Sequence, residues 1–182
     1  MTTGDKGWSI GLPTAGETVV RYMLRPGART GAAFSEGLGQ LRAGGLAPVG
    51  RFRSLGSGKG EPLTASHTLT AAGLEFEFEV LVGGGVREAA FTAPGWTELQ
   101  QALDEDSWWN LVDRLAAAVG ARFGALGDGE ALAPELPSSA SGWNVLMWRH
   151  MGILVPRLLE PDLQMAQLYR MLPQSHLQLF LR

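Results

Sequence analysis

The sequence predicts an α+β fold in which helices pack on one face of a mostly antiparallel sheet. Three observations lead to this class. Segments with strand or helix patterns follow one another in the order β-α-β-β-β-α, so hairpins outnumber βαβ units. Residues 74–82 alternate apolar and acidic side chains, which is typical of a half-buried strand. Residues 108–119 carry apolar side chains at helical spacing, which is typical of a helix packed on such a sheet.

The first half of the chain contains two expected strands and one helix. A strand is expected over residues 18–24, which are rich in β-forming side chains and are followed by the turn pair Pro26-Gly27. Thr30 is then expected to cap a helix that runs to about Ala43, because apolar residues follow it at helical spacing. Two glycines end that helix, and residues 48–55 predict the next strand.

The middle of the chain predicts a hairpin and the main helix. Three glycines follow residues 74–82, and residues 86–91 return as a partner strand. The acidic run Asp104–Asp106 favours a helix start, because negative charge stabilises a helix N-terminus. The apolar stripe carries this helix to Val119, and residues 122–126 predict a short strand.

A Pro/Ser-rich connector divides the chain near its C-terminal end. We expect a single domain over residues 1–182, made of an α+β core at 1–133, a connector at 134–142 and a C-terminal helical segment at 143–182 packed on the core. The C-terminal segment is too short to bury a core of its own.

Three patterns define the expected C-terminal segment. Its first helix has Trp143, Met147, Trp148 and Met151 at helical spacing, which makes this stripe either core or an interface, and Pro156 should end or kink that helix. A second helix is expected over residues 161–172, and its first residue is a proline. Residues 177–182 alternate and predict a last strand.

Composition excludes several classes of function. The net charge is −3 and lysine occurs only at Lys6 and Lys59, so the chain lacks the clustered basic face that nucleic-acid binding requires. It has no cysteine, which removes disulfides, thiolate nucleophiles and cysteine zinc sites. The longest apolar stretch, residues 143–155, is interrupted by Arg149 and His150 and is too short to span a membrane. No signal-like apolar region follows the N-terminus, so we expect a soluble, cytoplasmic protein, and the abundance of alanine, glycine and arginine suggests a bacterial source.

No catalytic, cofactor-binding or metal-binding residue is predicted. The three histidines, His67, His150 and His176, share no metal-ligand spacing. The stretch Gly58-Lys59-Gly60 lacks the remaining residues of a phosphate loop, and no serine lies in a G-x-S-x-G motif. Whether the chain is an enzyme stays open, and the sequence favours a protein that is not one.

The candidate binding residues are outward charged side chains of three strands and two tryptophans. If Val20, Tyr22 and Leu24 point inward, the arginines beside them point outward, and the same argument applies to the neighbours of Phe52. Trp108 and Trp109 are about 100° apart on their helix, so we expect one of them at the helix edge, under the C-terminal segment or against a partner. The partner-binding candidates are therefore Arg21, Arg25, Arg51, Arg53, Glu75, Glu77, Glu79, Trp108 and Trp109.

These features favour a non-enzymatic protein-binding module with a protein partner, such as an immunity protein that neutralises a toxin or an accessory subunit of a larger assembly. The first alternative is a small-molecule-binding protein or an enzyme with a dispersed site on the open sheet face. In that case Arg21, Arg51 and Arg53 would hold an anionic ligand, and His67 or Glu77 would act as acid or base. The second alternative is a homo-oligomeric structural subunit. The chain shows no family motif, so these classes rest on analogy.

Overall fold

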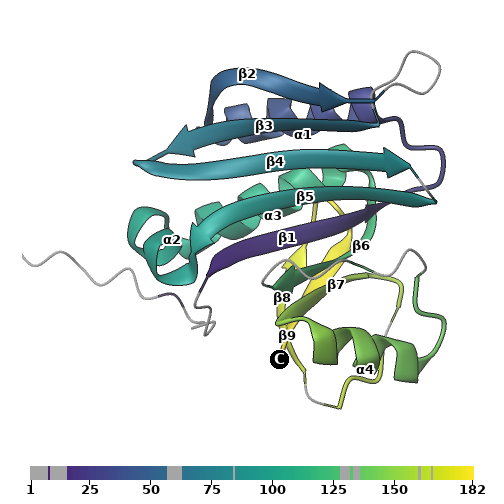
Figure 1. Ribbon diagram of the computed structural model, residues 1–182. Helices are drawn as coiled ribbons and strands as arrows, with labels where there is room; N and C mark the ends of the chain where they lie inside the picture. The colour runs from purple at the N-terminus through teal and green to yellow at the C-terminus, as the bar shows by residue number, and fades with distance from the viewer. Residues whose placement is uncertain are drawn as a thin grey trace, which may run out of the picture.

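The structure is a computed structural model that describes residues 8, 16–56, 63–83, 85–127, 132, 136–159, 161–164 and 166–182. These residues form four helices and one nine-stranded, wholly antiparallel sheet (Figure 1). The predicted α+β class with an antiparallel sheet is therefore confirmed. The stretch Gly58-Lys59-Gly60 and the start of the connector at 134–135 lie outside the described residues.

The elements follow one another as β1 (Glu17–Leu24), α1 (Thr30–Ala43), β2 (Ala47–Leu55), β3 (Thr64–Ala71), β4 (Leu74–Gly83), β5 (Val86–Gly95), α2 (Trp96–Ala102), α3 (Glu105–Val119), β6 (Ala121–Gly127), α4 (Ala140–Arg149), β7 (Gly152–Pro156), β8 (Gln167–Leu172) and β9 (Leu177–Leu181). The strand order in the sheet is β2-β3-β4-β5-β1-β6-β7-β9-β8. The edges of the sheet are therefore β2 and β8.

The larger core lies between the sheet and helices α1, α2 and α3. Tyr22 of β1 and Phe78 of β4 enter this core from the sheet, and Trp108 and Leu115 enter it from α3. The side chains of Val20, Tyr22 and Leu24 all point into it, as their alternation predicts. Asp104 caps α3, since its Oδ1 accepts a hydrogen bond from the Ser107 backbone N–H at 2.8 Å.

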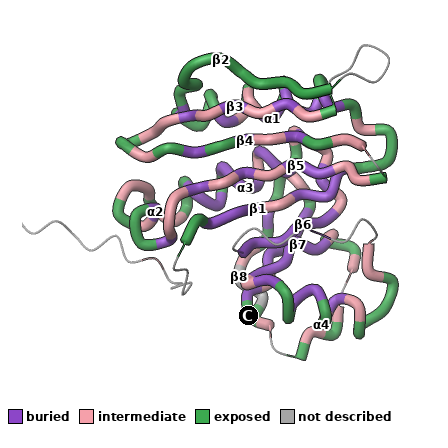
Figure 2. Tube along the Cα trace, in the orientation of Figure 1, coloured by how far each residue is buried: buried purple, intermediate pink, exposed green. Residues whose placement is uncertain are grey.

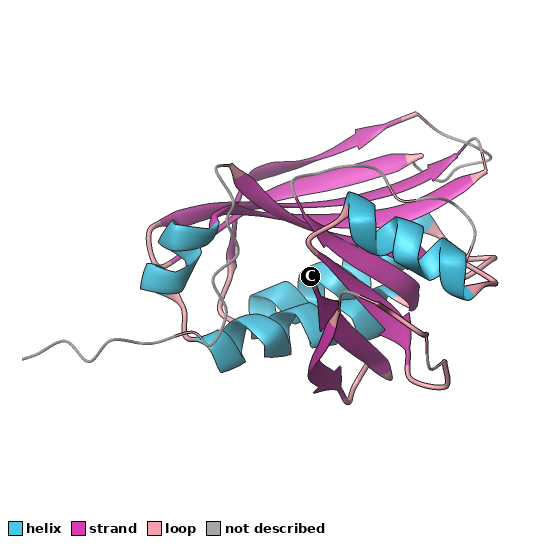
Figure 3. Cartoon of the chain, turned by 90° about the horizontal axis from the view of Figure 1, so that it is seen from below, coloured by secondary structure: helices cyan, strands magenta, loops and turns pink. Residues whose placement is uncertain are grey.

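Helix α4 packs on the opposite face of the sheet, which differs from the expected single helical layer. In β7, Leu154 points into the larger core, whereas Ile153 and Val155 point into a second core with Trp143 and Met147 of α4. Figure 3 shows α4 and α3 on opposite sides of the strands. The physical reason is that β6 and β7 are buried on both faces, so each face needs a covering layer.

The prediction that residues 143–182 are mainly helical is wrong. Helix α4 ends at Arg149, and the residues up to Pro156 form β7. The helix expected over 161–172 is absent from the described part of that range, which ends in strand β8. Strands β7 and β8 both pair with β9. Short apolar runs such as these fit a helix or a strand equally well, so the tertiary pairing decides which of the two forms.

The sequence interpretation also missed β3. Its residues, TASHTLTA, alternate threonine or serine with buried side chains, and they pair with β2 on one side and β4 on the other. The alternation is clear, but two of the three buried positions are alanine or histidine, so the strand has a weak apolar signal.

Candidate functional site

One half of the sheet leaves a face without a covering helix among the described elements. Helix α4 covers β6, β7 and β9, whereas the same face of β2, β3, β4 and β5 carries mainly polar side chains, most of them half-buried or exposed. Figure 2 shows the burial of each residue along these strands. We call this surface, together with Arg21 of β1, the open face.

The strand register arranges the open face in cross-strand rows, because directly opposed residues point to the same side. One row runs through Arg53, Ser66, Glu79, Ala90 and Arg21. A second row runs through Val49, Thr68, Glu77, Thr92 and Val19. A third runs through Leu55, Thr64, Leu81, Glu88 and Met23.

The glutamates of β4 form the acidic centre of this face, as their alternation predicts. Glu75 and Glu77 are exposed and Glu79 is half-buried. Burial, followed by the charge of Glu77, raises the pKa of the Glu79 carboxyl above its ordinary value, while Arg21 acts in the opposite direction. The carboxylates therefore repel one another more than the local arginine compensates.

Arg21 lies on the open face but not beside the glutamates of β4. Strand β5 separates β1 from β4, and Arg21 forms an ion pair with Glu88 of β5, diagonally across the strand pair. Glu88 is buried and was missed in the sequence interpretation. Its alternation with Ala90 and Thr92 was the available signal.

The other predicted arginines are distributed differently from the expectation. Arg53 lies in the row of Glu79, but β3 separates the two strands. Arg51 lies within a register break of β2 between Val49 and Arg53, so simple alternation does not set its face. Arg25 is exposed in the turn after β1 and does not belong to the sheet face, which corrects the prediction for this residue.

Large apolar side chains are exposed at the β2 end of the sheet. On the open face these are Val49, Leu55 and Leu81, and Leu55 is 70% exposed. Phe52 was expected to point inward. Its ring centroid is 6.3 Å from that of Phe34 in α1, yet Phe52 is 60% exposed. This corner therefore combines apolar surface with the two arginines of β2.

Trp108 and Trp109 are both buried, at 0% and 1% exposure. Neither offers a surface to a partner, which corrects their assignment as partner-binding residues. Trp108 stacks on Phe91 of the sheet. Trp109 lies at the other side of α3 and lines a groove with residues of β8, so it is under the C-terminal segment, one of the three positions expected.

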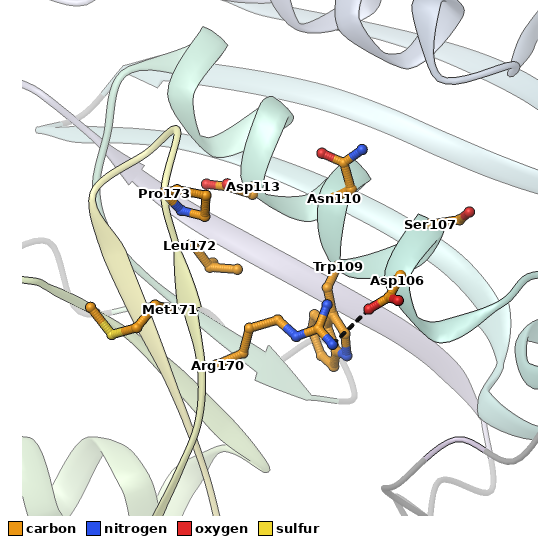
Figure 4. A pocket seen from close by; sticks show the side chains of 9 residues that line it. All are labelled: Asp106, Ser107, Trp109, Asn110, Asp113, Arg170, Met171, Leu172 and Pro173. Carbon is orange, nitrogen blue, oxygen red and sulfur yellow. Dashed lines mark hydrogen bonds and ion pairs between the residues drawn. The ribbon is translucent and has the colours of Figure 1, made fainter.

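The groove beside Trp109 has a volume of about 400 Å³ and lies between α3 and the β8–β9 turn (Figure 4). Its α3 wall carries Asp106 and Asn110, and its β8 wall carries Arg170 and Met171. Arg170 Nη2 donates to Asp106 Oδ1 at 2.8 Å across the groove. The sequence interpretation missed this groove because its walls are about sixty residues apart in the chain.

Asp113 lines the same groove but is already engaged. Its carboxylate accepts hydrogen bonds from the backbone N–H groups of Gln174 and Ser175 at 3.0 and 2.8 Å, and from the Ser175 hydroxyl at 2.6 Å. It therefore fastens the β8–β9 turn to α3. Nearby, burial and the Asp113 charge raise the pKa of Tyr22 well above its ordinary value, and the Tyr22 hydroxyl donates to Val112 O.

The histidines do not converge on the open face. His67 lies opposite Phe78, so it points toward the helices, whereas Glu77 points to the open face. Its Nδ1 lies 2.9 Å from the Thr68 carbonyl oxygen. The prediction of His67 as an acid or base on the open face is therefore wrong. Within the described ranges, no group of three or more His, Cys, Asp or Glu side chains is placed to hold a metal ion.

Helix α4 carries most of the tryptophan and methionine stripe that the sequence predicts to be either core or an interface. Trp143 and Met147 are buried in the second core, whereas Trp148 is 64% exposed. Trp148 borders a small cleft of about 80 Å³ with Asn144 and Arg182. The predicted stripe is thus core at two positions and surface at Trp148.

No known protein family matches this chain, and no curated protein sequence is significantly similar to it. None of the described helices is both long and apolar enough to cross a membrane.

Proposed function

We propose that this chain is a protein-binding module whose partner docks on the open face. The observation that carries the proposal is the asymmetry of the sheet. The half formed by β6, β7 and β9 is covered by α4, whereas the half formed by β2 to β5 presents an ordered, charged surface of side chains held by rigid strands.

The charge pattern specifies the kind of partner surface. The centre of the open face holds Glu75, Glu77 and Glu79, and the nearest arginine, Arg21, is paired with Glu88. Burial, followed by the charge of Glu77, raises the pKa of Glu79, and a protein that places lysine or arginine side chains over β4 would offset the repulsion between these carboxylates. An immunity protein and an accessory subunit of a larger assembly both work through docking of this kind.

The test uses the purified chain as bait in an extract of the cells that naturally contain it. We expect one stoichiometric protein partner. Glu77→Lys should weaken its binding at least about tenfold, because like charges would then face each other across the interface. The matched control is Glu36→Lys, an equal charge change at an exposed position on α1. Recovery of no partner, or equal binding by both variants, would contradict docking on the open face.

The groove between α3 and β8 supports a second candidate function, the binding of a small molecule. Its volume of about 400 Å³ lies within the range of ordinary ligand sites, roughly 300–1,000 Å³. A small-molecule screen by thermal shift tests this function. Hits should lose their effect in Asn110→Trp, since the new side chain would fill the groove. Hits that still stabilise this variant bind elsewhere.

A further inference from the structure

Strand β2 lies at one edge of the sheet. Among the described elements, only α1 lies near it, where Phe34 contacts Phe52, and its other face has no covering element. All nine of its residues are exposed (Figure 2). The opposite edge, β8, differs, because Leu172 is buried against the larger core and Arg170 is tied to α3. Edge strands present unpaired backbone N–H and C=O groups, and an extended peptide can add to such an edge by main-chain hydrogen bonds.

The side chains of β2 indicate which peptide would fit. Arg51 and Arg53 form no ion pair or hydrogen bond with any residue that the structure describes. Val49 and Leu55 expose apolar surface on the open face, on either side of Arg53. The edge therefore offers two unpaired positive charges between apolar side chains.

We propose that an extended acidic segment of the partner adds to β2 as a tenth strand. This inference rests on the proposed function and names the part of the partner that meets the sheet edge. A glutamate or aspartate directly opposite Arg53 would have its Cβ about 5 Å from that of the arginine, within reach of an ion pair. An apolar residue two positions from this acid would cover Leu55, and one four positions away on the other side would cover Val49.

A second copy of this chain fits the same edge poorly. A two-fold antiparallel pairing centred on Phe52 would place Arg51 of one copy opposite Arg53 of the other. Moving the centre to either arginine would place that residue opposite itself. Like charges directly opposite each other destabilise a strand pair. In these three registers the charge of β2 therefore favours a partner of opposite charge over a second copy.

The first experiment titrates the full ¹⁵N-labelled chain with two nine-residue synthetic peptides. One has glutamate at its centre, valine two and four positions away on either side and threonine between them, and its matched control has lysine in place of the glutamate. The glutamate peptide should shift the amide resonances of β2 and bind at least about tenfold more tightly than the lysine peptide. Arg51→Glu/Arg53→Glu should reverse this preference. Arg42→Glu/Arg157→Glu, which changes two exposed arginines elsewhere, should preserve it. No binding at millimolar peptide, or shifts confined to residues outside β2, would overturn the inference.

The second experiment separates this inference from the proposed function. It measures partner affinity for Glu77→Lys and for Arg51→Glu/Arg53→Glu in parallel. Loss of binding in both variants supports both proposals. Loss in Glu77→Lys alone overturns strand addition and leaves docking on the open face standing. Unchanged binding in both variants overturns the two proposals together.

Discussion

Replacement of Asp113 by alanine should loosen the β8–β9 hairpin from α3. Asp113 is 2% exposed and accepts three hydrogen bonds from two residues of the turn, Gln174 and Ser175. Alanine would leave two backbone N–H groups and one hydroxyl without this acceptor. Each hydrogen bond to a charged group contributes about 1.5–3 kcal/mol, but water reaches the exposed turn and removing a buried carboxylate relieves its own desolvation cost. We therefore expect a net loss of about 3 kcal/mol in the free energy of unfolding.

Urea denaturation of the variant and of the original chain measures this loss. The matched control is Asp106→Ala, which removes a carboxylate from the same helix whose side chain is 86% exposed and paired only with Arg170 among the described residues. An exposed ion pair of this kind is worth about 0–1 kcal/mol. Amide hydrogen exchange should also accelerate in β8 and β9 of Asp113→Ala. A loss no larger than that of the control would refute the role given to Asp113.

Three further predictions test single buried or half-buried groups. Trp108→Phe should cost about 1 kcal/mol less than Trp109→Phe in urea unfolding, because no described residue accepts from Trp108 Nε1 whereas Trp109 Nε1 donates to Glu105 at 3.3 Å. Equal costs would contradict this difference. Thr18→Val should stabilise the fold by about 1 kcal/mol, since the buried Thr18 hydroxyl has no partner in the described part of the chain. A loss of stability would show that the hydroxyl is bonded. Glu79 has a raised pKa, so its contribution is favourable below the unfolded pKa and is lost as the pH rises through the folded pKa. Glu79→Gln should therefore gain stability relative to the original chain between pH 4 and pH 7, by less than about 1 kcal/mol because solvent screens this half-buried group. No change in relative stability across that range would refute the sign.

Local pattern was sufficient for the elements with a strong periodic signal. The helix predicted after Thr30 matches α1 within one residue, although the N-cap is Arg29 and not Thr30. The acidic alternation of residues 74–82 matches β4 within one residue. Both segments combine a clear period with glycine at their ends, so local and tertiary preferences agree. The C-terminal segments lack that agreement. The run Gly152–Pro156 is five residues long and fits a buried helix turn as well as a strand.

The sequence predicts which side chains lie on the open face, but not which of them lie next to one another. Strand alternation correctly assigned Arg21 and Glu77 to one face. It could not reveal that β5 lies between their strands, because strand order depends on pairing between distant segments. The ion pair of Arg21 therefore forms with Glu88, which lies on the intervening strand.

The two neighbouring tryptophans show how a helix pattern can indicate a second covering layer. Trp108 and Leu115 face the sheet, while Trp109, Asp113 and Ala116 follow one another at intervals of four and three residues along another side of α3. All five of these residues are buried. The buried part of the α3 surface is therefore wider than the part that faces the sheet, and a second layer must cover the rest. The sheet extends through β7 and β9 to β8, so the β8–β9 turn packs against the side of α3 that carries Trp109. The carboxylate of Asp113 within that apolar side then requires donors from the covering layer, and the turn supplies them. An acidic residue on a second apolar face of a helix thus predicts a chain turn with free N–H groups packed over it, even where the sequence does not identify which turn it is.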